Sequence, residues 1–256
     1  MQWAWRFMKV PQPEKWCFII GCYNSGTTLL NQILGLHPYI GSMPNEGQFY
    51  TRQLLRGADV GLRRLWALKP ELFRMDEKDV DRVNSDRLKR EWAWFYNDVR
   101  RPVLIEKTIA NAARTLWLQH NFHPAYFIVL IRDPYAVAEG IRRKEGHSLE
   151  DAIIQWRNSY VEIFAAKPKL QHCLILTYEQ LTENPSDTLL KISDFLNIPA
   201  FGFQKEDKQF TVHKFTSEIS NQNARSYDRL SPDDLALINR LAGPEIESFN
   251  YQRRLP

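Results

Sequence analysis

A short apolar run that leads through a glycine-bracketed turn into a helix constrains the fold more than any other feature of this sequence. Residues 16–30 read WCFIIGCYNSGTTLL, which predicts a buried strand over residues 16–21 and a helix over residues 27–36. Gly21 and Gly26 allow the intervening backbone to turn its N–H groups inward. Because a helix N-terminus carries partial positive charge, this unit predicts a cradle for phosphate or sulfate.

The loop is close to a P-loop but departs from it at one position. A P-loop reads GxxxxGK[ST], and this chain has the glycine spacing with Thr27 where the phosphate-binding lysine belongs. The missing lysine disfavours nucleotide hydrolysis. A P-loop kinase therefore ranks below the other functions that the sequence supports.

Composition favours a single domain over residues 1–256. The 256 residues are 44% hydrophobic, and the apolar segments are spread evenly along the chain. Lys and Arg total 34 against 30 for Asp and Glu, and because the basic residues are dispersed, a nucleic-acid partner is not expected. No run of about 18 apolar residues occurs, so no membrane span is expected.

Three cysteines indicate a reducing compartment. Cys17, Cys22 and Cys173 are odd in number and lack the spacing of metal ligands, so we interpret them as reduced thiols that mostly fill the core. We therefore expect a cytoplasmic protein without a bound metal.

The alternation of apolar runs and helical patterns predicts an α/β fold. Further strands are expected at residues 103–105, 125–131 and 173–177. Further helices are expected from about residue 110 to 120, from Ser148 onward, from Asn184 through Phe195, and from Ser231 to a stop at Gly243. Near-continuous apolar strands covered by helices are typical of parallel sheets. The prediction is a three-layer, P-loop-like fold with a central parallel sheet flanked by helices.

Residues 48–101 are expected to form an insertion between these strand units. The segment is basic and its sequence pattern is helical. It contains Trp66, Trp92 and Trp94, which we assign to core or lid packing rather than to a sugar-stacking platform. We expect the insertion to shape the acceptor side of the site.

A second anion-binding group is predicted at the end of another strand. The strand at residues 126–131 is followed by Arg132, Asp133 and Pro134, and open parallel sheets bind ligands at the carboxyl ends of their strands. The arginine guanidinium offers a planar fork of donors to an anion. Two anion sites at two strand ends suit a ligand with phosphates at both ends.

At these residues the chain resembles the sulfotransferases that use 3′-phosphoadenosine 5′-phosphosulfate (PAPS). Residues 21–30 resemble the 5′-phosphosulfate loop of that family, residues 127–134, FIVLIRDP, resemble its 3′-phosphate motif, and residues 177–181, TYEQL, are similar to its Tyr-Glu-Asp-Leu segment. His37-Pro38 and residues 106–108, EKT, have counterparts in the tyrosylprotein and carbohydrate branches. The resemblance implies PAPS as the sulfuryl donor, adenosine 3′,5′-bisphosphate (PAP) as the product, and no required metal.

The resemblance also assigns binding roles to individual residues. Ser25, Gly26, Thr27 and Thr28 would hold the 5′-phosphosulfate, and Arg132 would hold the 3′-phosphate. Tyr178 would lie near the adenine, and Arg225 would reach the 3′-phosphate from a late loop. The complete set of expected donor-binding residues is Cys22, Tyr23, Asn24, Ser25, Gly26, Thr27, Thr28, Arg132, Tyr178 and Arg225.

Two positions depart from the family pattern. The family loop usually has Lys or Arg before Ser-Gly-Thr, where this chain has the uncharged Asn24. The family usually has a serine eight residues after the arginine, where this chain has Gly140. Arg142 or Arg143, one turn further on, is a candidate to compensate for the missing hydroxyl.

Sulfuryl transfer needs a base for the acceptor proton and positive charge near the departing oxygen. Glu46 is the first candidate for the base, and the alternative is a solvated loop carboxylate. Lys107, just after a strand, is the candidate cation, and the alternative is a surface lysine paired with Glu106 or another acid. His37, His120 and His123 flank turns or prolines and are expected to face solvent.

Two main functions follow from these observations. The first is transfer of a sulfuryl group from PAPS to a hydroxyl acceptor, which is a carbohydrate, a peptide tyrosine or another small molecule, with an amine ranked lower. The second is a catalytically impaired protein that binds PAPS or PAP, and the changes at Asn24 and Gly140 favour it. The sequence leaves the acceptor and the oligomeric state open.

Overall fold

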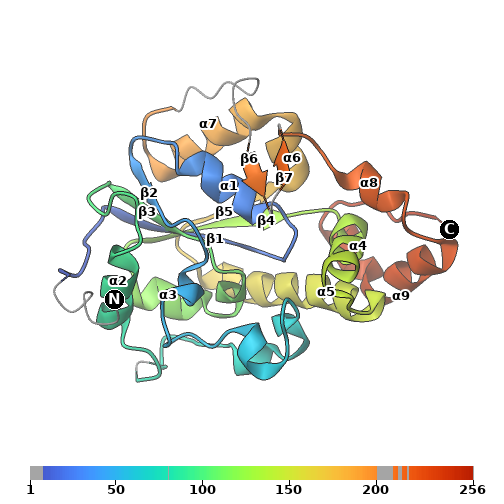
Figure 1. Cartoon of the computed structure of the whole chain (residues 1–256), viewed down its shortest axis with the longest axis horizontal. Helices are drawn as coiled ribbons and strands as arrows, with labels where there is room; N and C mark the ends of the chain where they lie inside the picture. Colours follow the sequence, from blue (N-terminus) through green and yellow to red (C-terminus); the bar gives the residue numbers. More distant parts are fainter. Residues whose placement is uncertain (1–7, 80, 201–209, 213–214, 218, 256) are drawn as a thin grey trace.

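Five parallel strands form the centre of the structure in the order β2-β3-β1-β4-β5 (Figure 1). The computed structural model describes residues 8–79, 81–200, 210–212, 215–217 and 219–255. The strands are β1 (Lys15–Gly21), β2 (Ile40–Ser42), β3 (Val103–Glu106), β4 (Ala125–Ile131) and β5 (Cys173–Thr177). Because β1 is central and pairs with both β3 and β4, their carboxyl ends meet at one edge of the sheet.

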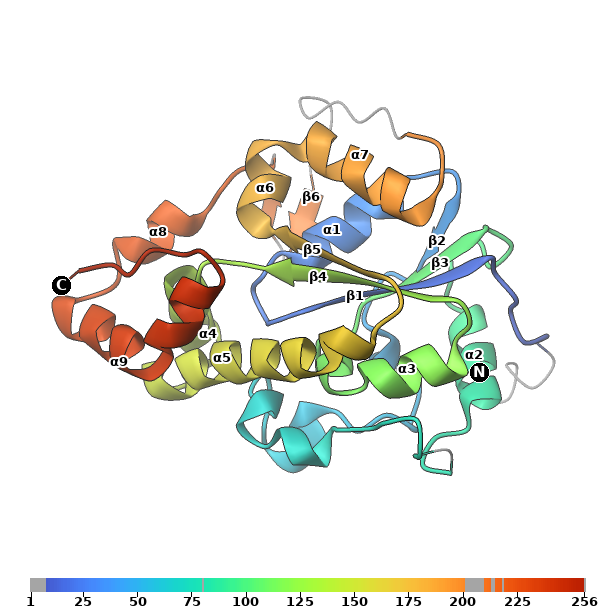
Figure 2. The same cartoon turned by 180° about the vertical axis from the view of Figure 1, so that it is seen from behind.

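Helices cover both faces of this sheet, as Figures 1 and 2 show. One face carries α1 (Thr27–Leu34), α6 (Tyr178–Glu183) and α7 (Pro185–Leu196). The other face carries α3 (Thr115–Asn121) and α5 (Leu149–Ala166), with α4 (Pro134–Glu145) and α9 (Pro232–Ser248) beside α5. The predicted three-layer α/β fold is confirmed.

Each face of the sheet has its own apolar core. Between the sheet and α1 and α7, Ile19, Ile33 and Ile192 are fully buried. On the opposite face, Phe18 of β1 and Trp156 of α5 belong to a larger cluster. Burial of each such side chain contributes roughly 1.5–3 kcal/mol. The two cores hold the strand ends, and therefore the loops that follow them, in fixed positions.

The segment at residues 48–101 is less helical than predicted. It consists mainly of loops and short 3₁₀ turns, with one α-helix, α2 (Ser85–Ala93). Gly57, Gly61 and Pro70 interrupt the pattern before a regular helix can form. The segment is anchored to α5, since the Ala67 N–H donates to Gln155 Oε1 at 2.8 Å. Trp66 and Trp92 are buried, whereas Trp94 is about half exposed.

Two predicted helix boundaries were wrong. The stretch expected from residue 110 begins as a 3₁₀ turn, Ile109–Ala113, and only then becomes α3. The last helix continues past Gly243 to Ser248. A Cβ at Gly243 would lie 2.7 Å from the Arg253 guanidinium carbon, so this glycine leaves room for the Arg253 side chain rather than ending the helix.

The remaining elements lie near the carboxyl ends of the strands and beside α1. A short hairpin, β6 (Phe210–Val212) and β7 (Phe215–Ser217), contacts α1. The helix α8 (Asn223–Tyr227) leads into α9 beside α4. Within the described ranges, none of the helices has the length and apolar character needed to cross a membrane.

Candidate functional site

The loop between β1 and α1 is a tight turn with two residues in the left-handed region. The φ angles are 62° at Asn24 and 90° at Gly26. A Cβ at Gly26 would lie 2.6 Å from Cδ2 of Tyr178, and a Cβ at Gly21 would lie 2.5 Å from the Leu130 carbonyl oxygen. Both glycines are therefore required by close packing, and the alternation of backbone conformations is the type that forms anion-binding nests.

Ser25 ties this loop to the sheet and to α5. Its hydroxyl lies 3.0 Å from the Tyr160 hydroxyl, which donates to the Leu130 carbonyl at 2.9 Å. Because the single proton of Tyr160 goes to Leu130, Ser25 must be the donor to Tyr160. Ser25 is fully buried, so this chain of hydrogen bonds fixes the loop from below.

Arg132, at the end of β4, lies directly against the same loop. Its Nη1 donates to the Asn24 carbonyl at 2.7 Å, and its guanidinium lies 4.0 Å from the centre of the Tyr178 ring. Nη2 makes no hydrogen bond with any residue that the structure describes. The two groups predicted from separate motifs are therefore adjacent, and one guanidinium nitrogen has no partner among the residues described.

Tyr178 is buried between the loop and Arg132. Its ring meets Gly26 on one side and the guanidinium on the other, and its hydroxyl donates to the Ser220 carbonyl at 3.1 Å. The ring supports both anion-binding groups. Its contact with an adenine stays a prediction.

The late segment reaches Arg132 through a residue that the sequence did not single out. Arg225 is exposed on α8, whereas Asn223 is buried and accepts from Arg132 Nε at 2.8 Å. Asn223 also donates to Glu179 at 2.6 Å, and Glu179 accepts from the Tyr251 hydroxyl at 2.9 Å. The position of Glu179 in the TYEQL segment was a signal for this network.

Glu46 and Lys107 form a buried ion pair. The Lys107 ammonium donates to Glu46 Oε1 at 3.1 Å, and Gln48 donates to the other carboxylate oxygen. The side chains are only 12% and 7% exposed, so Glu46 is not a solvated loop carboxylate. Lys107 follows β3, and Glu46 precedes the 3₁₀ turn Gly47–Phe49. The two expected catalytic residues are together, and their roles stay predictions.

Glu106 holds the backbone on both sides of this pair. Its carboxylate accepts from the Gly47 N–H at 2.7 Å, from Asn111 Nδ2 at 2.6 Å and from the Thr108 hydroxyl. Burial raises the pKa of Glu106 to about 7, and the hydrogen bonds from Thr108 and Gly47 oppose that rise. The sequence signal for Glu106 is an acidic residue at the end of a buried strand, although the prediction from sequence does not place it in the site.

Tyr23 lies between the loop and the ion pair. Burial and then the nearby Glu46 carboxylate raise the pKa of Tyr23, while the Arg64 guanidinium, 5.7 Å from the ring centre, lowers it. Its neighbour Cys22 is fully buried, so the Cys22 side chain belongs to the core. Tyr23, in the predicted anion-binding loop, is therefore near enough to Glu46 to be affected by its charge.

Arg142 and Arg143, the candidates to compensate for the serine missing at Gly140, both form ion pairs within the protein. Arg142 donates to Asp234 at 2.9 Å, and Arg143 donates to Glu139 at 2.8 Å. Both guanidiniums are engaged in ion pairs with carboxylates of α9 and α4.

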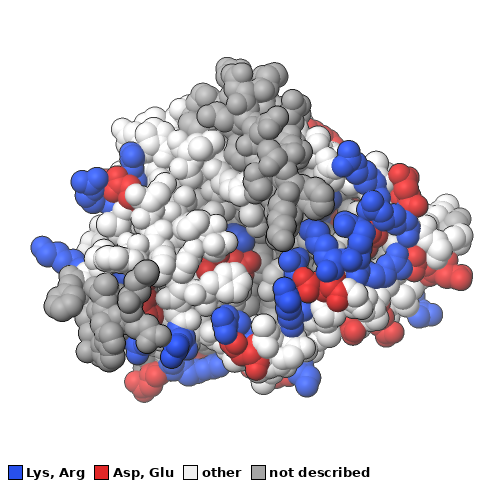
Figure 3. Space-filling view, viewed as in Figure 1, with Lys and Arg blue, Asp and Glu red and all other residues white. Residues whose placement is uncertain are grey.

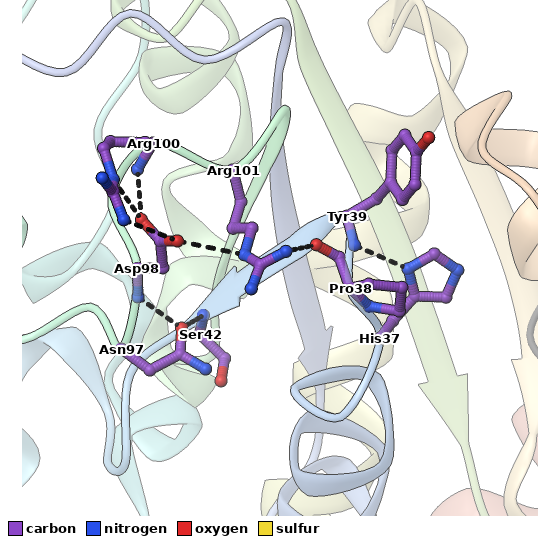
Figure 4. Close-up of polar contacts among 8 residues, drawn as sticks. All are labelled: His37, Pro38, Tyr39, Ser42, Asn97, Asp98, Arg100 and Arg101. Atoms are coloured by element: carbon purple, nitrogen blue, oxygen red, sulfur yellow. Dashed lines mark hydrogen bonds and ion pairs between the residues drawn. The ribbon is translucent and has the colours of Figure 1, made fainter.

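A shallow hollow occurs at the opposite edge of the sheet, where β2 and β3 begin (Figure 4). There the Asp98 carboxylate accepts from both Arg100 and Arg101, so both guanidiniums are engaged within the protein. His37, expected to face solvent, is instead buried, and its Nδ1 accepts from the Tyr39 N–H at 3.0 Å. That prediction was wrong because the turn before β2 folds the ring inward against Pro199, whose carbonyl lies 3.0 Å from Nε2.

Among the described residues, no group of three or more His, Cys, Asp or Glu side chains is arranged to hold a metal ion. The loop side of the site offers donors: a left-handed turn at a helix N-terminus and the Arg132 guanidinium, with the Lys107 ammonium paired to Glu46. Such a set suits an anionic ligand.

The first strand of the parallel sheet turns through two glycines into a helix, and the adjacent strand ends in an arginine. These features define an α/β protein of the P-loop-like class. The chain belongs to the sulfotransferase family, whose family model matches residues 17–202.

Two curated relatives extend the comparison. The chain is 26% identical over 203 residues to protein-tyrosine sulfotransferase A of Caenorhabditis elegans, an alignment that covers 71% of this chain and 50% of the relative. It is 22% identical over 288 residues to the nodulation protein NoeE of Sinorhizobium fredii, covering 93% of this chain and 66% of the relative. The chain thus spans only half to two thirds of the length of these relatives.

Solved sulfotransferases share the fold. The sulfotransferase domain of the Synechococcus PCC 7002 olefin synthase superimposes with a TM-score of 0.61 at 22% identity, with full coverage of both chains. The sulfotransferase domain of the curacin biosynthetic pathway gives 0.58 at 19% identity, covering 97% of this chain and all of that domain. Mouse sulfotransferase SULT7A1, solved in complex with PAP, gives 0.50 at 13% identity, covering 93% and 86%.

Proposed function

We propose that this protein transfers a sulfuryl group from PAPS to a hydroxyl acceptor. The observation that carries the proposal is the contact between the two predicted anion-binding groups, with Arg132 Nη1 2.7 Å from the Asn24 carbonyl of the loop. Membership of the sulfotransferase family and the fold shared with a PAP complex of mouse SULT7A1 support it.

The donors at this site fit a doubly anionic nucleotide. Asn24 Nδ2 is buried and has no hydrogen-bond partner among the described residues, and Arg132 Nη2 is likewise without one. The turn at Asn24 and Gly26 opens α1, whose N-terminus favours negative charge. Residues 22–28, Arg132 and Tyr178 would hold the nucleotide, and Arg225 remains a candidate from α8.

The buried ion pair supports catalysis rather than binding alone. When bound, PAPS supplies an activated sulfuryl group, with PAP as the product. Glu46 accepts the proton of the acceptor hydroxyl, and Lys107, which holds Glu46 Oε1 at 3.1 Å, supplies positive charge. Glu106 keeps the flanking residues Gly47 and Thr108 in position.

The acceptor is proposed to approach from the side of the insertion at residues 48–101. Phe49, whose N–H donates to the Glu46 carbonyl at 3.0 Å, is exposed over 57% of its surface. Trp94 and Phe95 are also exposed, and Phe95 stacks on Tyr50 at 3.9 Å between ring centres. Exposed aromatic rings on this insertion suit a phenolic, tyrosyl or carbohydrate hydroxyl. The relative that acts on protein tyrosine supports the same class.

Nucleotide binding and transfer test the proposal separately. Isothermal titration calorimetry is expected to show PAP binding to the wild-type protein and its loss in Arg132→Met. Labelled PAPS is then expected to transfer sulfate to at least one hydroxyl acceptor in a panel of phenols, tyrosyl peptides and oligosaccharides. Absence of PAP binding would overturn the assignment, while binding without transfer to any acceptor would select the catalytically impaired alternative.

The cytoplasmic location is also a proposal. It rests on the three cysteines, Cys17, Cys22 and Cys173, which are free thiols. Fractionation of cells that express the protein tests it, and recovery from an oxidising compartment would contradict it.

A further inference from the structure

Lys144, in the last turn of α4, reaches the anion-binding loop. Its ammonium donates to Asn24 Oδ1 at 2.8 Å, across 120 residues of sequence. This hydrogen bond places a positive charge beside position 24, where the family loop usually has Lys or Arg and this chain has the uncharged Asn24. Arg132 donates to the carbonyl of the same residue, so two cations converge on Asn24.

The contact with Lys144 fixes the orientation of the Asn24 amide. An ammonium group can only donate, so the amide atom that faces it must be the oxygen. The NH₂ group is therefore turned away from Lys144, and within the described part of the chain it has no hydrogen-bond partner although it is buried. An unpaired buried donor is costly, so a ligand oxygen that accepts from it gains accordingly.

Gly140 provides the room for this orientation. A Cβ at position 140 would lie 3.2 Å from Asn24 Nδ2, closer than ordinary side-chain contact. The Asn24 amide thus extends into the space that a serine side chain at position 140 would enter. The two departures from the family pattern, at Asn24 and at Gly140, are parts of one arrangement.

The surroundings of Lys144 are positively charged. Partial burial, then the charges of Arg64, Arg143 and Arg132, lowers the pKa of Lys144 to about 8. Figure 3 shows many Lys and Arg side chains gathered on the side of the molecule where α4, α8 and α9 lie. Cations that repel one another in this way are stabilised by a bound anion.

We propose that Asn24 and Lys144 act as one unit that binds the 3′-phosphate of the nucleotide together with Arg132. The Asn24 NH₂ supplies the hydrogen bond that the family's serine would make, since this chain has Gly140 at that position. Lys144 supplies the positive charge that the loop lacks. This inference rests on the proposed function, because the ligand is the PAPS or PAP nucleotide.

Calorimetry with two nucleotides tests the inference. PAP carries the 3′-phosphate and adenosine 5′-monophosphate (AMP) lacks it, so the ratio of their affinities isolates that group. Wild-type protein is expected to prefer PAP. Lys144→Met is expected to weaken PAP binding about tenfold and to leave AMP binding within about twofold, as loss of a charge-assisted hydrogen bond predicts. Lys191→Met, which removes an exposed lysine of α7, is the matched control and should change neither affinity.

Asn24→Asp tests the amide with the same side-chain size. Aspartate tolerates the left-handed backbone, but it replaces the NH₂ donor by a carboxylate oxygen, so the preference for PAP should be lost. Thermal melting of each variant verifies folding. An unchanged PAP affinity in Lys144→Met, or equal weakening of PAP and AMP, overturns the inference and leaves the proposed function intact. Failure of the wild-type protein to bind PAP overturns the proposed function itself.

Discussion

The Tyr160 hydroxyl joins three elements of the site, so its removal should cost stability. Tyr160 lies on α5, receives a hydrogen bond from the loop residue Ser25, and donates to Leu130 of β4. Tyr160→Phe keeps the buried ring and deletes only the oxygen. The variant leaves the Ser25 hydroxyl and the Leu130 carbonyl without their partner in a dry environment.

The size of the effect follows from these two bonds. A neutral hydrogen bond contributes roughly 0.5–1.5 kcal/mol net, and a buried group left unpaired costs about 1–3 kcal/mol. The expected loss in the free energy of unfolding is therefore about 2–4 kcal/mol. For a chain of this size, that loss corresponds to a fall in melting temperature of roughly 5–15 °C.

Urea denaturation of the single and double variants measures this loss. Tyr39→Phe is the matched control, because Tyr39 is 42% exposed. Loss of its hydroxyl should lower the free energy of unfolding by less than about 0.5 kcal/mol. A double-mutant cycle with Ser25→Ala should give a coupling energy of about 0.5–1.5 kcal/mol. The reasoning is refuted if Tyr160→Phe is no more destabilising than Tyr39→Phe, or if the two substitutions add without coupling.

Three further predictions concern the titratable groups of the site. Glu46→Gln should lower the rate of sulfuryl transfer in single-turnover assays by a factor of about 10²–10⁴, while calorimetry should show PAP affinity within about twofold of wild type. An unimpaired rate would exclude Glu46 as the base. Because the pKa of Lys144 is about 8, the affinity ratio of PAP to AMP should fall as pH rises from 7 to 9.5, and should be flat over that range in Lys144→Met. Burial raises the pKa of Glu106 from 4.5 to about 7, so the folded state holds a proton that the unfolded state releases between these values. As pH rises from 4.5 to 7, the free energy of unfolding of the wild-type protein should therefore fall by about 3 kcal/mol relative to that of Glu106→Gln. Curves of unfolding free energy against pH that run parallel for the two proteins would contradict this.

The sequence predicted the parts of the fold that depend on local patterns. An apolar run before Gly21 and a helical pattern after Gly26 identified β1 and α1, because burial on both faces of a parallel strand leaves a continuous apolar signal. The same signal located β4 and therefore Arg132. These features need only neighbouring residues to be recognised.

Contacts between distant segments could not be predicted in this way. Lys144 reaches Asn24 only because α4 starts at Pro134 and presents this residue toward the loop, and a shift of one residue in that start would move it away. Asn223, rather than the more conspicuous Arg225, meets Arg132 for a similar reason. The 48–101 segment consists mainly of loops and short 3₁₀ turns, with α2 its one described α-helix, so most of it lacks the periodicity on which a helix prediction depends.

The network around Asn223 shows that the environment of Arg132 depends on residues beyond the family model. The family model ends at residue 202, yet Asn223 accepts from Arg132 and Tyr251 donates to Glu179, so the final fifty residues brace the guanidinium from outside the matched segment. A shortened chain that stops at residue 202 would retain all five strands and the glycine turn. Its Arg132 would keep the Asn24 carbonyl and the Tyr178 ring but lose the Asn223 acceptor, and the side of α5 that packs on Ile238 and Ile246 of α9 would be uncovered.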